Sequence, residues 1–197
     1  MGKVQPVIDH LGKVFKSVYC LPQNASVDEA MIPFKGRSSL KQYIPLKPVK
    51  RGIKVRAILD ASNGYVAGFQ VYTGKKKDRV EKDLGANVVK ALAMPYNTYR
   101  HIYFDNYFCS IQLLLDLLKC GLYGCGTIQT NRKGLPKCLK MVAKKGLGKR
   151  GRSKAYQCVK LTATVWQDRK PVIVVVTNSE PKTPTKVSRK NRDDREV

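Results

Sequence analysis

Two aspartates in this sequence are placed where they could bind a metal ion. Asp28 lies in VDEAMIPF (27–34), which has apolar side chains on both parities and is predicted to be a short strand. Asp105 lies in HIYFDNYF (101–108), another predicted strand, which is expected to end near Asp105. If these strands are neighbours, the two carboxylates converge at one edge of a sheet. Hard cations such as Mg²⁺ choose oxygen ligands, and one or two carboxylates suffice when substrate phosphates and water complete the site.

The chemistry that such a site performs is phosphodiester cleavage. Two metal ions about 3.5–4 Å apart can activate a water and stabilise the departing oxygen. A structural interpretation is also open: Asp28 could shape a turn after Asn24, and Asp105 could be a turn residue ahead of the helix that starts at Ser110. Spacing alone leaves both interpretations standing.

The charge of the sequence points to a polyanionic partner. There are 38 Lys plus Arg against 14 Asp plus Glu, a formal net charge of +24. Such cations bind polyanions by releasing condensed counterions, which makes nucleic acid the first candidate. The segment 35–51 holds six Lys or Arg and no acid. The residues predicted to bind phosphates are Lys35, Arg37, Lys41, Lys47, Lys50, Arg51, Lys54, Arg132 and Lys133.

Two other classes of protein find little support in the sequence. No apolar run approaches the roughly 20 residues that a membrane-spanning helix needs, so we expect no membrane partner. The six cysteines form no C-x-x-C pair, and only His10 and His101 could complement them in a zinc site. Reduced and mostly buried thiols are expected instead.

The order of predicted elements indicates an α/β fold. A helix is expected over 6–19, and strands 52–60 and 64–72 flank the turn dipeptide Asn63-Gly64, which predicts a hairpin. Helices over 84–94 and 110–121 alternate with the strand 101–108 and a further strand 122–130. Three strands followed by helix, strand, helix and strand predict a mixed sheet with an antiparallel hairpin and a parallel part.

The composition changes at Asn131 and divides the sequence into three parts. Residues 1–130 form the first part of the α/β core. Residues 132–154 hold ten Lys or Arg and no acid, and two predicted strands follow at 157–168 and 170–178. We therefore predict a basic, β-rich inserted lobe over 131–178. Residues 179–197 are polar without an apolar pattern and are predicted to be a disordered tail.

Several motifs resemble the catalytic core of piggyBac transposases, in order and in spacing. The block VDEAMI (27–32) followed by FKGR (34–37) resembles the opening block of that core, and FDNYF (104–108) with Ser110-Ile111 resembles its second acidic motif. The other matching blocks are YIP (43–45), KP (47–48), KRGIK (50–54), GYV (64–66), VYTGK (71–75), GT (126–127), NRKGLP (131–136), Trp166, Asp168 and PV (171–172). The resemblance runs from about residue 6 to residue 178.

The resemblance implies a fold, a partner and a chemistry. It implies an RNase H-like mixed sheet flanked by helices and interrupted by a β-rich insertion. Members of the family cut DNA with Mg²⁺ held by three aspartates and join it to TTAA targets through a freed 3′ hydroxyl. By motif, Asp28 would be the first aspartate and Asp105 the second, and both would be catalytic ligands of Mg²⁺ or Mn²⁺.

The sequence also departs from the family pattern. In the family, the third aspartate follows the insertion and lies in a Met-Gly-Gly-Val-Asp type motif. This sequence has no such motif, and Asp193 and Asp194 lack its neighbours. Neither the family's N-terminal DNA-binding and dimerisation region nor its cysteine-rich tail is recognised here. We therefore expect a core fragment with a weakly bound metal and incomplete catalysis, and a homodimer only as a property of full-length relatives.

Two other functions are kept open beside this one. A non-catalytic, domesticated DNA-binding module would use the same cations without the metal site. A basic ribonucleoprotein component is a further possibility, although no aromatic RNA-recognition motif supports it. A nuclear location is expected from the DNA partner and the Lys-Arg clusters.

Overall fold

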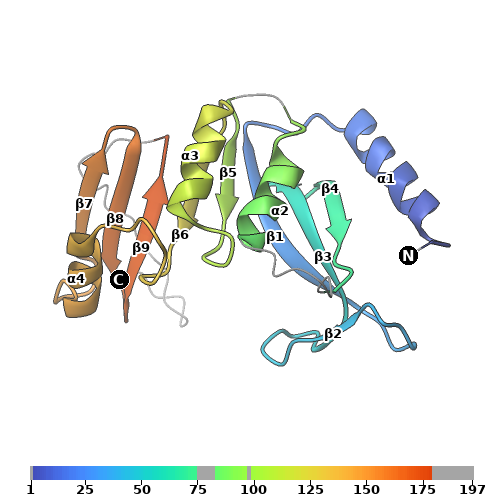
Figure 1. The fold of residues 1–197 in the computed structure, drawn as a ribbon, viewed down its shortest axis with the longest axis horizontal. Helices are drawn as coiled ribbons and strands as arrows, with labels where there is room; N and C mark the ends of the chain where they lie inside the picture. The colour runs from blue at the N-terminus through green and yellow to red at the C-terminus, as the bar shows by residue number, and fades with distance from the viewer. Residues whose placement is uncertain (1, 75–82, 97–98, 179–197) are drawn as a thin grey trace, which may run out of the picture.

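A computed structural model describes residues 2–74, 83–96 and 99–178. These residues form a single sheet with the strand order β2-β3-β1-β5-β6-β9-β8-β7, in which β4 also pairs with β3 (Figure 1). The elements are α1 (Gln5–Val18), β1 (Asn24–Pro33), β2 (Lys41–Tyr43), β3 (Arg51–Asp60), β4 (Val66–Val71), α2 (Leu84–Ala93), β5 (His101–Phe104), α3 (Ile111–Lys119), β6 (Tyr123–Thr127), α4 (Lys137–Lys145), β7 (Ser153–Cys158), β8 (Leu161–Gln167) and β9 (Pro171–Val176).

The sheet is mixed, which confirms the predicted fold class. β1, β5 and β6 are parallel, whereas β3, β4, β7, β8 and β9 join through antiparallel pairs. The parallel pairs need crossover connections, and α3 supplies the one between β5 and β6. Within the described residues, no helix is long and apolar enough to cross a bilayer.

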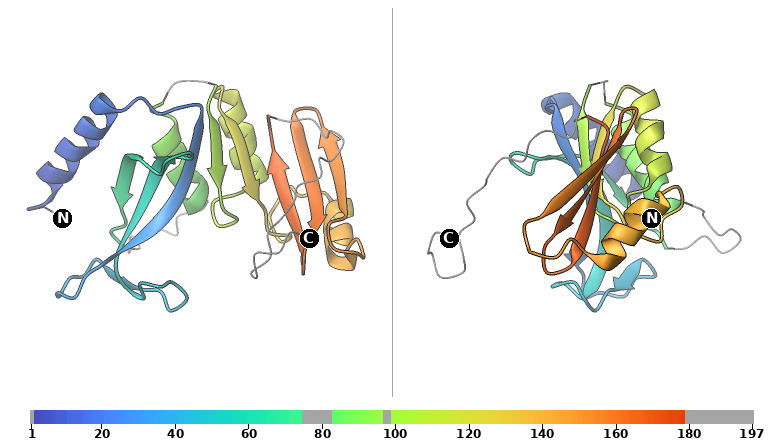
Figure 2. Two further views of the ribbon diagram at one scale, coloured as in Figure 1. Left: turned by 180° about the vertical axis from the view of Figure 1, so that it is seen from behind. Right: turned by 90° about the vertical axis from the view of Figure 1, so that its left-hand side faces the viewer.

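The two faces of the sheet have different surroundings. Helices α2, α3 and α4 lie on one face, which we call the helix face (Figure 2). Strand residues that point to it are buried, among them Val27, Ile102 and Phe104. Residues of the opposite parity lie on what we call the open face, where Val174 and Val176 are only half-buried and Trp166 is 38 % exposed. Helix α1 packs against β4, where the Phe15 and Phe69 ring centroids are 5.9 Å apart.

Local signals in the sequence account for several elements. Ser110 caps α3, since its Oγ accepts a hydrogen bond from the Leu113 N–H at 3.1 Å. Gly64 takes a φ of +76° in the turn between β3 and β4, which pair as predicted. The predicted strand over 157–168 is wrong in its bounds: it covers the end of β7, a tight turn and β8. Strand β2 and helix α4 were not predicted.

The segment 131–178 continues the main sheet. β9 pairs with β6 through Cys125↔Val176, Gly126↔Val175 and Thr127↔Val174, and β8 and β7 extend the sheet beyond it. Helix α4 covers β8 and β9 on the helix face. The division at residue 131 stays a prediction, and the predicted tail over 179–197 lies outside the described residues.

Asp60 anchors α1 to the β3–β4 hairpin. Its carboxylate also makes the stability of the fold depend on pH in the acidic range. Its buried carboxylate accepts hydrogen bonds from the Ser62 hydroxyl at 2.6 Å, the Ser62 N–H at 2.7 Å and the Tyr19 hydroxyl. These bonds, those from Ser62 first, hold the pKa of Asp60 below its usual 3.8. A lowered pKa stabilises the fold above pH 3.8, and this stabilisation is lost as the pH falls through the lowered value.

We expect Asp60→Asn to lower the free energy of unfolding near neutral pH and to reduce its loss in acid. The amide keeps the shape of the side chain but loses the charge that favours three donors. Urea unfolding near neutral pH and near pH 3 measures both effects. The control is Asp9→Asn on the exposed side of α1; equal stability of the two variants would contradict this role.

Candidate active site

The register of β1 and β5 brings the two predicted metal ligands side by side. These parallel strands pair through Val27↔Phe104, and Asp28 and Asp105 are the next residue of each. The two strands run in the same direction, towards the end of the sheet from which the loops around β2 project (Figure 1). Adjacent strands lie about 4.8 Å apart, so the backbone positions of the two aspartates are close enough for their side chains to reach a common cation.

Asp28 also lies on the accessible face of the sheet. Val27 and Phe104 are 2 % and 7 % exposed and point to the helices, so alternation puts Asp28 on the open face. Both aspartates are exposed. Because β1 begins at Asn24, Asp28 lies in the middle of a strand and not at its start, and the turn after Asn24 that was the alternative explanation does not exist.

The hydrogen bonds of the two carboxylates leave one oxygen of each available. Asp105 Oδ1 accepts the N–H groups of Tyr107 at 3.0 Å and Phe108 at 3.4 Å, an Asx turn that leads into α3. Asp28 Oδ1 accepts the Glu29 N–H at 2.7 Å. In the described part of the chain, neither Oδ2 has a hydrogen-bond or ion-pair partner. The turn interpretation of Asp105 is therefore correct and is compatible with a ligand role.

The carboxylate oxygens of Asp28 and Asp105 are suitable ligands for a hard divalent cation. Two exposed carboxylates with available oxygens, one on β1 and one just after β5, are ligands of the kind that Mg²⁺ prefers, with water and phosphate filling the remaining positions. Over the described ranges 2–74, 83–96 and 99–178, no three His, Cys, Asp or Glu side chains cluster as a metal site. The described residues thus supply a two-carboxylate pair.

Glu29, the second acid of the pair at 28–29, has a different role. It shares its register position with Arg56 on β3 and points away from Asp28. Its carboxylate forms an ion pair with Lys54, and Lys47 Nζ lies 3.9 Å from its other oxygen. The Lys54 and Glu29 side chains are only 13 % and 17 % exposed. Glu29 therefore connects β1 to β3 and to the basic loop, a role that the sequence did not reveal.

Arg132 holds the loop that carries Asp105. Its Nη2 donates to the carbonyl oxygens of Asn106 at 3.0 Å and Tyr107 at 2.8 Å. Lys54 Nζ approaches the same loop and lies 5.3 Å from the centroid of the Tyr107 ring. Both cations were predicted to bind phosphates. The structure gives them intramolecular partners around Asp105, and their contact with nucleic acid stays a prediction.

Most of the other predicted cations lie around β2, beyond the end of β1. Lys41 Nζ donates to the Gly36 carbonyl at 3.0 Å and thereby closes the loop before β2. The Arg51 guanidinium lies 5.1 Å from the centroid of the Tyr43 ring, whose side chain is 61 % exposed. The predicted cations that are exposed to solvent are Lys35, Arg37, Lys50, Arg51 and Lys133. They lie where a nucleic-acid backbone could be contacted.

The cysteines are more exposed than the sequence predicted. The prediction of mostly buried thiols is wrong, because Cys20, Cys120, Cys138 and Cys158 are exposed. Cys109, at the start of the connection to α3, is buried, and its burial raises the pKa of the thiol to about 12. It is neutral at physiological pH and packs as an apolar group beside the Asp105 loop.

The fold defines the class of protein, an α/β core with a mixed sheet in which two acidic residues directly follow the last paired residues of the parallel strands β1 and β5. A model of the family described as Transposase IS4 matches residues 1–197, and the chain belongs to this family. The chain is also similar to two human proteins. It is 32 % identical over 136 residues to piggyBac transposable element-derived protein 3, and 31 % identical over 142 residues to piggyBac transposable element-derived protein 2.

A solved structure supports the same assignment. The chain matches piggyBac transposase in a synaptic complex with hairpin DNA, with a TM-score of 0.81, 26 % identity and 97 % of this chain covered. This match confirms the RNase H-like fold expected from the resemblance. The matched segments cover 65 % and 66 % of this chain but only 22 % and 23 % of the two human proteins, and 39 % of the chain in the solved structure.

Proposed function

We propose that this chain is a DNA-binding transposase core in which Asp28 and Asp105 form a metal-dependent site for cleaving DNA. The observation that carries the proposal is the parallel register that ends in Val27↔Phe104, because Asp28 and Asp105 are the next residue of each chain segment and both are exposed. A bound Mg²⁺ or Mn²⁺ would supply a Lewis acid for phosphodiester chemistry. Asp28 and Asp105 would hold it, and Arg132 would keep the Asp105 loop in place.

DNA binding rests on the cations around this site. The exposed Lys and Arg of the segments around β2 lie at the end of the sheet towards which β1 and β5 run, beyond the end of β1, so a backbone held by them could extend towards the carboxylates (Figure 1). The similarity to a transposase that was solved with hairpin DNA supports the same partner. A nuclear site of action is part of the proposal because it follows from a DNA partner.

The metal is expected to bind weakly and the cleavage to be slow. The described residues supply two carboxylates, whereas the family resemblance leads one to expect three. When catalytic residues act as a unit, the loss of one of them removes most of the rate of the catalysed reaction. Residual nicking, and not complete strand transfer, is the activity that we assign to the described residues.

The test is a nicking assay on supercoiled plasmid with Mn²⁺ or Mg²⁺, combined with Mn²⁺ binding followed by electron paramagnetic resonance. We expect Asp28→Asn and Asp105→Asn each to reduce nicking by about 10²-fold or more and to reduce Mn²⁺ binding. Asp9→Asn removes the same charge on α1 and serves as the matched control. Nicking and Mn²⁺ binding that persist in both site variants would refute the assignment.

The same experiment addresses the non-catalytic alternative. DNA binding that is unaffected by Mn²⁺, by Asp28→Asn and by Asp105→Asn would identify a DNA-binding module without metal chemistry. Stronger binding to RNA than to DNA of the same length would favour the ribonucleoprotein alternative.

A further inference from the structure

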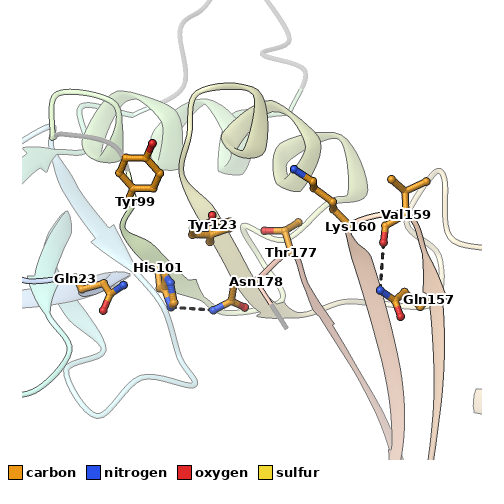
Figure 3. Close-up of a pocket in the computed structure, with 9 residues that line it drawn as sticks. All are labelled: Gln23, Tyr99, His101, Tyr123, Gln157, Val159, Lys160, Thr177 and Asn178. Atoms are coloured by element: carbon orange, nitrogen blue, oxygen red, sulfur yellow. Dashed lines mark hydrogen bonds between the residues drawn. The ribbon is translucent and has the colours of Figure 1, made fainter. Parts of the chain in front are cut away.

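A cleft lies on the sheet away from the two carboxylates. Its volume is about 500 Å³, and it opens between the amino ends of β5 and β6 and the turn that joins β7 to β8 (Figure 3). This volume is in the range of small-molecule sites. Side chains that line it are Tyr99, His101 and Tyr123 on one side and Gln157, Val159 and Lys160 on the other.

The chemistry of this cleft combines aromatic rings, amides and one cation. The His101 and Tyr123 rings are perpendicular, with centroids 5.2 Å apart, and the Tyr99 side chain is 71 % exposed. The Asn178 side-chain amide lies 2.8 Å from His101 Nδ1, and Figure 3 shows the two side chains joined by this hydrogen bond among the lining residues. Lys160 is the cation, and the described residues that line the cleft include no acid.

The backbone on both rims is held in an unfavourable conformation. Three described residues other than glycine have a positive φ, and two of them, Tyr99 at +65° and Val159 at +53°, line this cleft. Such values are outliers for bulky and β-branched residues and are found preferentially at functional sites. The Tyr99 N–H donates to the Gly121 carbonyl at 2.7 Å, which fixes the position from which the exposed ring projects.

The cleft lies on the same face of the sheet as the carboxylates. His101 and Tyr103 alternate with the buried Ile102 and Phe104, so both are on the open face. Four residues of extended chain separate His101 from Asp105, which corresponds to about 13 Å. One nucleic-acid strand on the open face could therefore reach both places.

We propose that this cleft binds one unpaired nucleotide of a single-stranded nucleic acid. The base would stack on Tyr99 and Tyr123, since aromatic rings accept any unstacked base. The amides of Gln157 and Asn178 would contact the edge of the base, and Lys160 would contact a phosphate. The inference rests on the proposed nucleic-acid binding but is independent of the metal site.

The experiment measures the affinity for a single-stranded oligothymidine and for a hairpin duplex by fluorescence anisotropy. Tyr99→Gly removes the ring while glycine accepts the positive φ, so the fold is preserved. We expect it to weaken single-strand binding by at least about fivefold and to leave duplex binding unchanged. Tyr99→Phe retains the ring and should match the parent protein.

Lys160→Gln provides a second, electrostatic readout. It should flatten the salt dependence of single-strand binding by about 0.7 in the slope of log K against log salt. Lys3→Gln removes an equal charge outside the cleft and should leave the slope unchanged. If the parent protein binds the duplex but Tyr99→Gly binds the single strand as well as the parent does, this inference is overturned and the proposed function stands. Failure of the parent to bind either nucleic acid overturns both.

Discussion

Raising the salt concentration from 50 to 200 mM should weaken duplex DNA binding by this protein about 500-fold. Five of the predicted phosphate ligands are exposed, namely Lys35, Arg37, Lys50, Arg51 and Lys133. Each phosphate contact contributes about −0.9 to the slope of log K against log salt, so five contacts give about −4.5. A fourfold change in salt at that slope produces the stated loss. Fluorescence anisotropy across the salt range measures the slope directly.

The position of these cations, and not the net charge of +24 alone, should determine the slope. Lys50→Gln combined with Arg51→Gln should flatten it by about 1.8 units, because both residues are exposed where the β2–β3 loop enters β3, on the proposed DNA path. Lys3→Gln combined with Lys13→Gln makes the same change in charge around α1, away from that loop (Figure 1). Equal slopes for the two double variants would show that binding is diffuse and would contradict the proposed DNA path.

The elements that could be predicted from the sequence are those with a strong local signal. α3 has an N-cap serine, and its leucines Leu113, Leu114 and Leu117 are fully buried at helical spacing. The β3–β4 hairpin has Asn63-Gly64 between two alternating runs. α4 was not predicted because its sequence, KCLKMVAKK, is rich in lysine. Leu139 is the one residue of this helix that is buried. β2 has three residues, too few for a periodic pattern.

The candidate site was predictable in identity but not in geometry. Motifs singled out Asp28 and Asp105, yet the register that sets them side by side depends on hydrogen bonds between segments 77 residues apart. Side-chain periodicity is local and carries no such information. For the same reason the sequence could not show that the two adjacent acids have different roles. Asp28 is exposed, whereas Glu29 forms an ion pair with Lys54. Nor could the sequence indicate the cleft at Tyr99, which five segments distant in the sequence form together.

Replacing Arg132 with methionine should damage the carboxylate site without touching a carboxylate. The guanidinium donates to the carbonyls of Asn106 and Tyr107, and the N–H of Tyr107 in turn donates to Asp105 Oδ1. Hydrogen bonds from charged donors contribute about 1.5–3 kcal/mol each, and the half-buried position of Arg132 favours the lower part of that range. We expect the free energy of unfolding in urea to fall by about 1–3 kcal/mol and Mn²⁺ binding to weaken.

Lys133→Met is the matched control, since Lys133 is the next residue in the chain and is exposed. It should leave stability and Mn²⁺ binding unchanged while flattening the salt slope of DNA binding by about 0.9 units. Arg132→Lys should recover part of the lost stability, because an ammonium keeps the charge and can donate to these carbonyls but lacks the planar guanidinium that holds Nη2 between them. If Arg132→Met instead behaved like Lys133→Met, both side chains would contact phosphate, and the Asp105 loop would keep its conformation without Arg132.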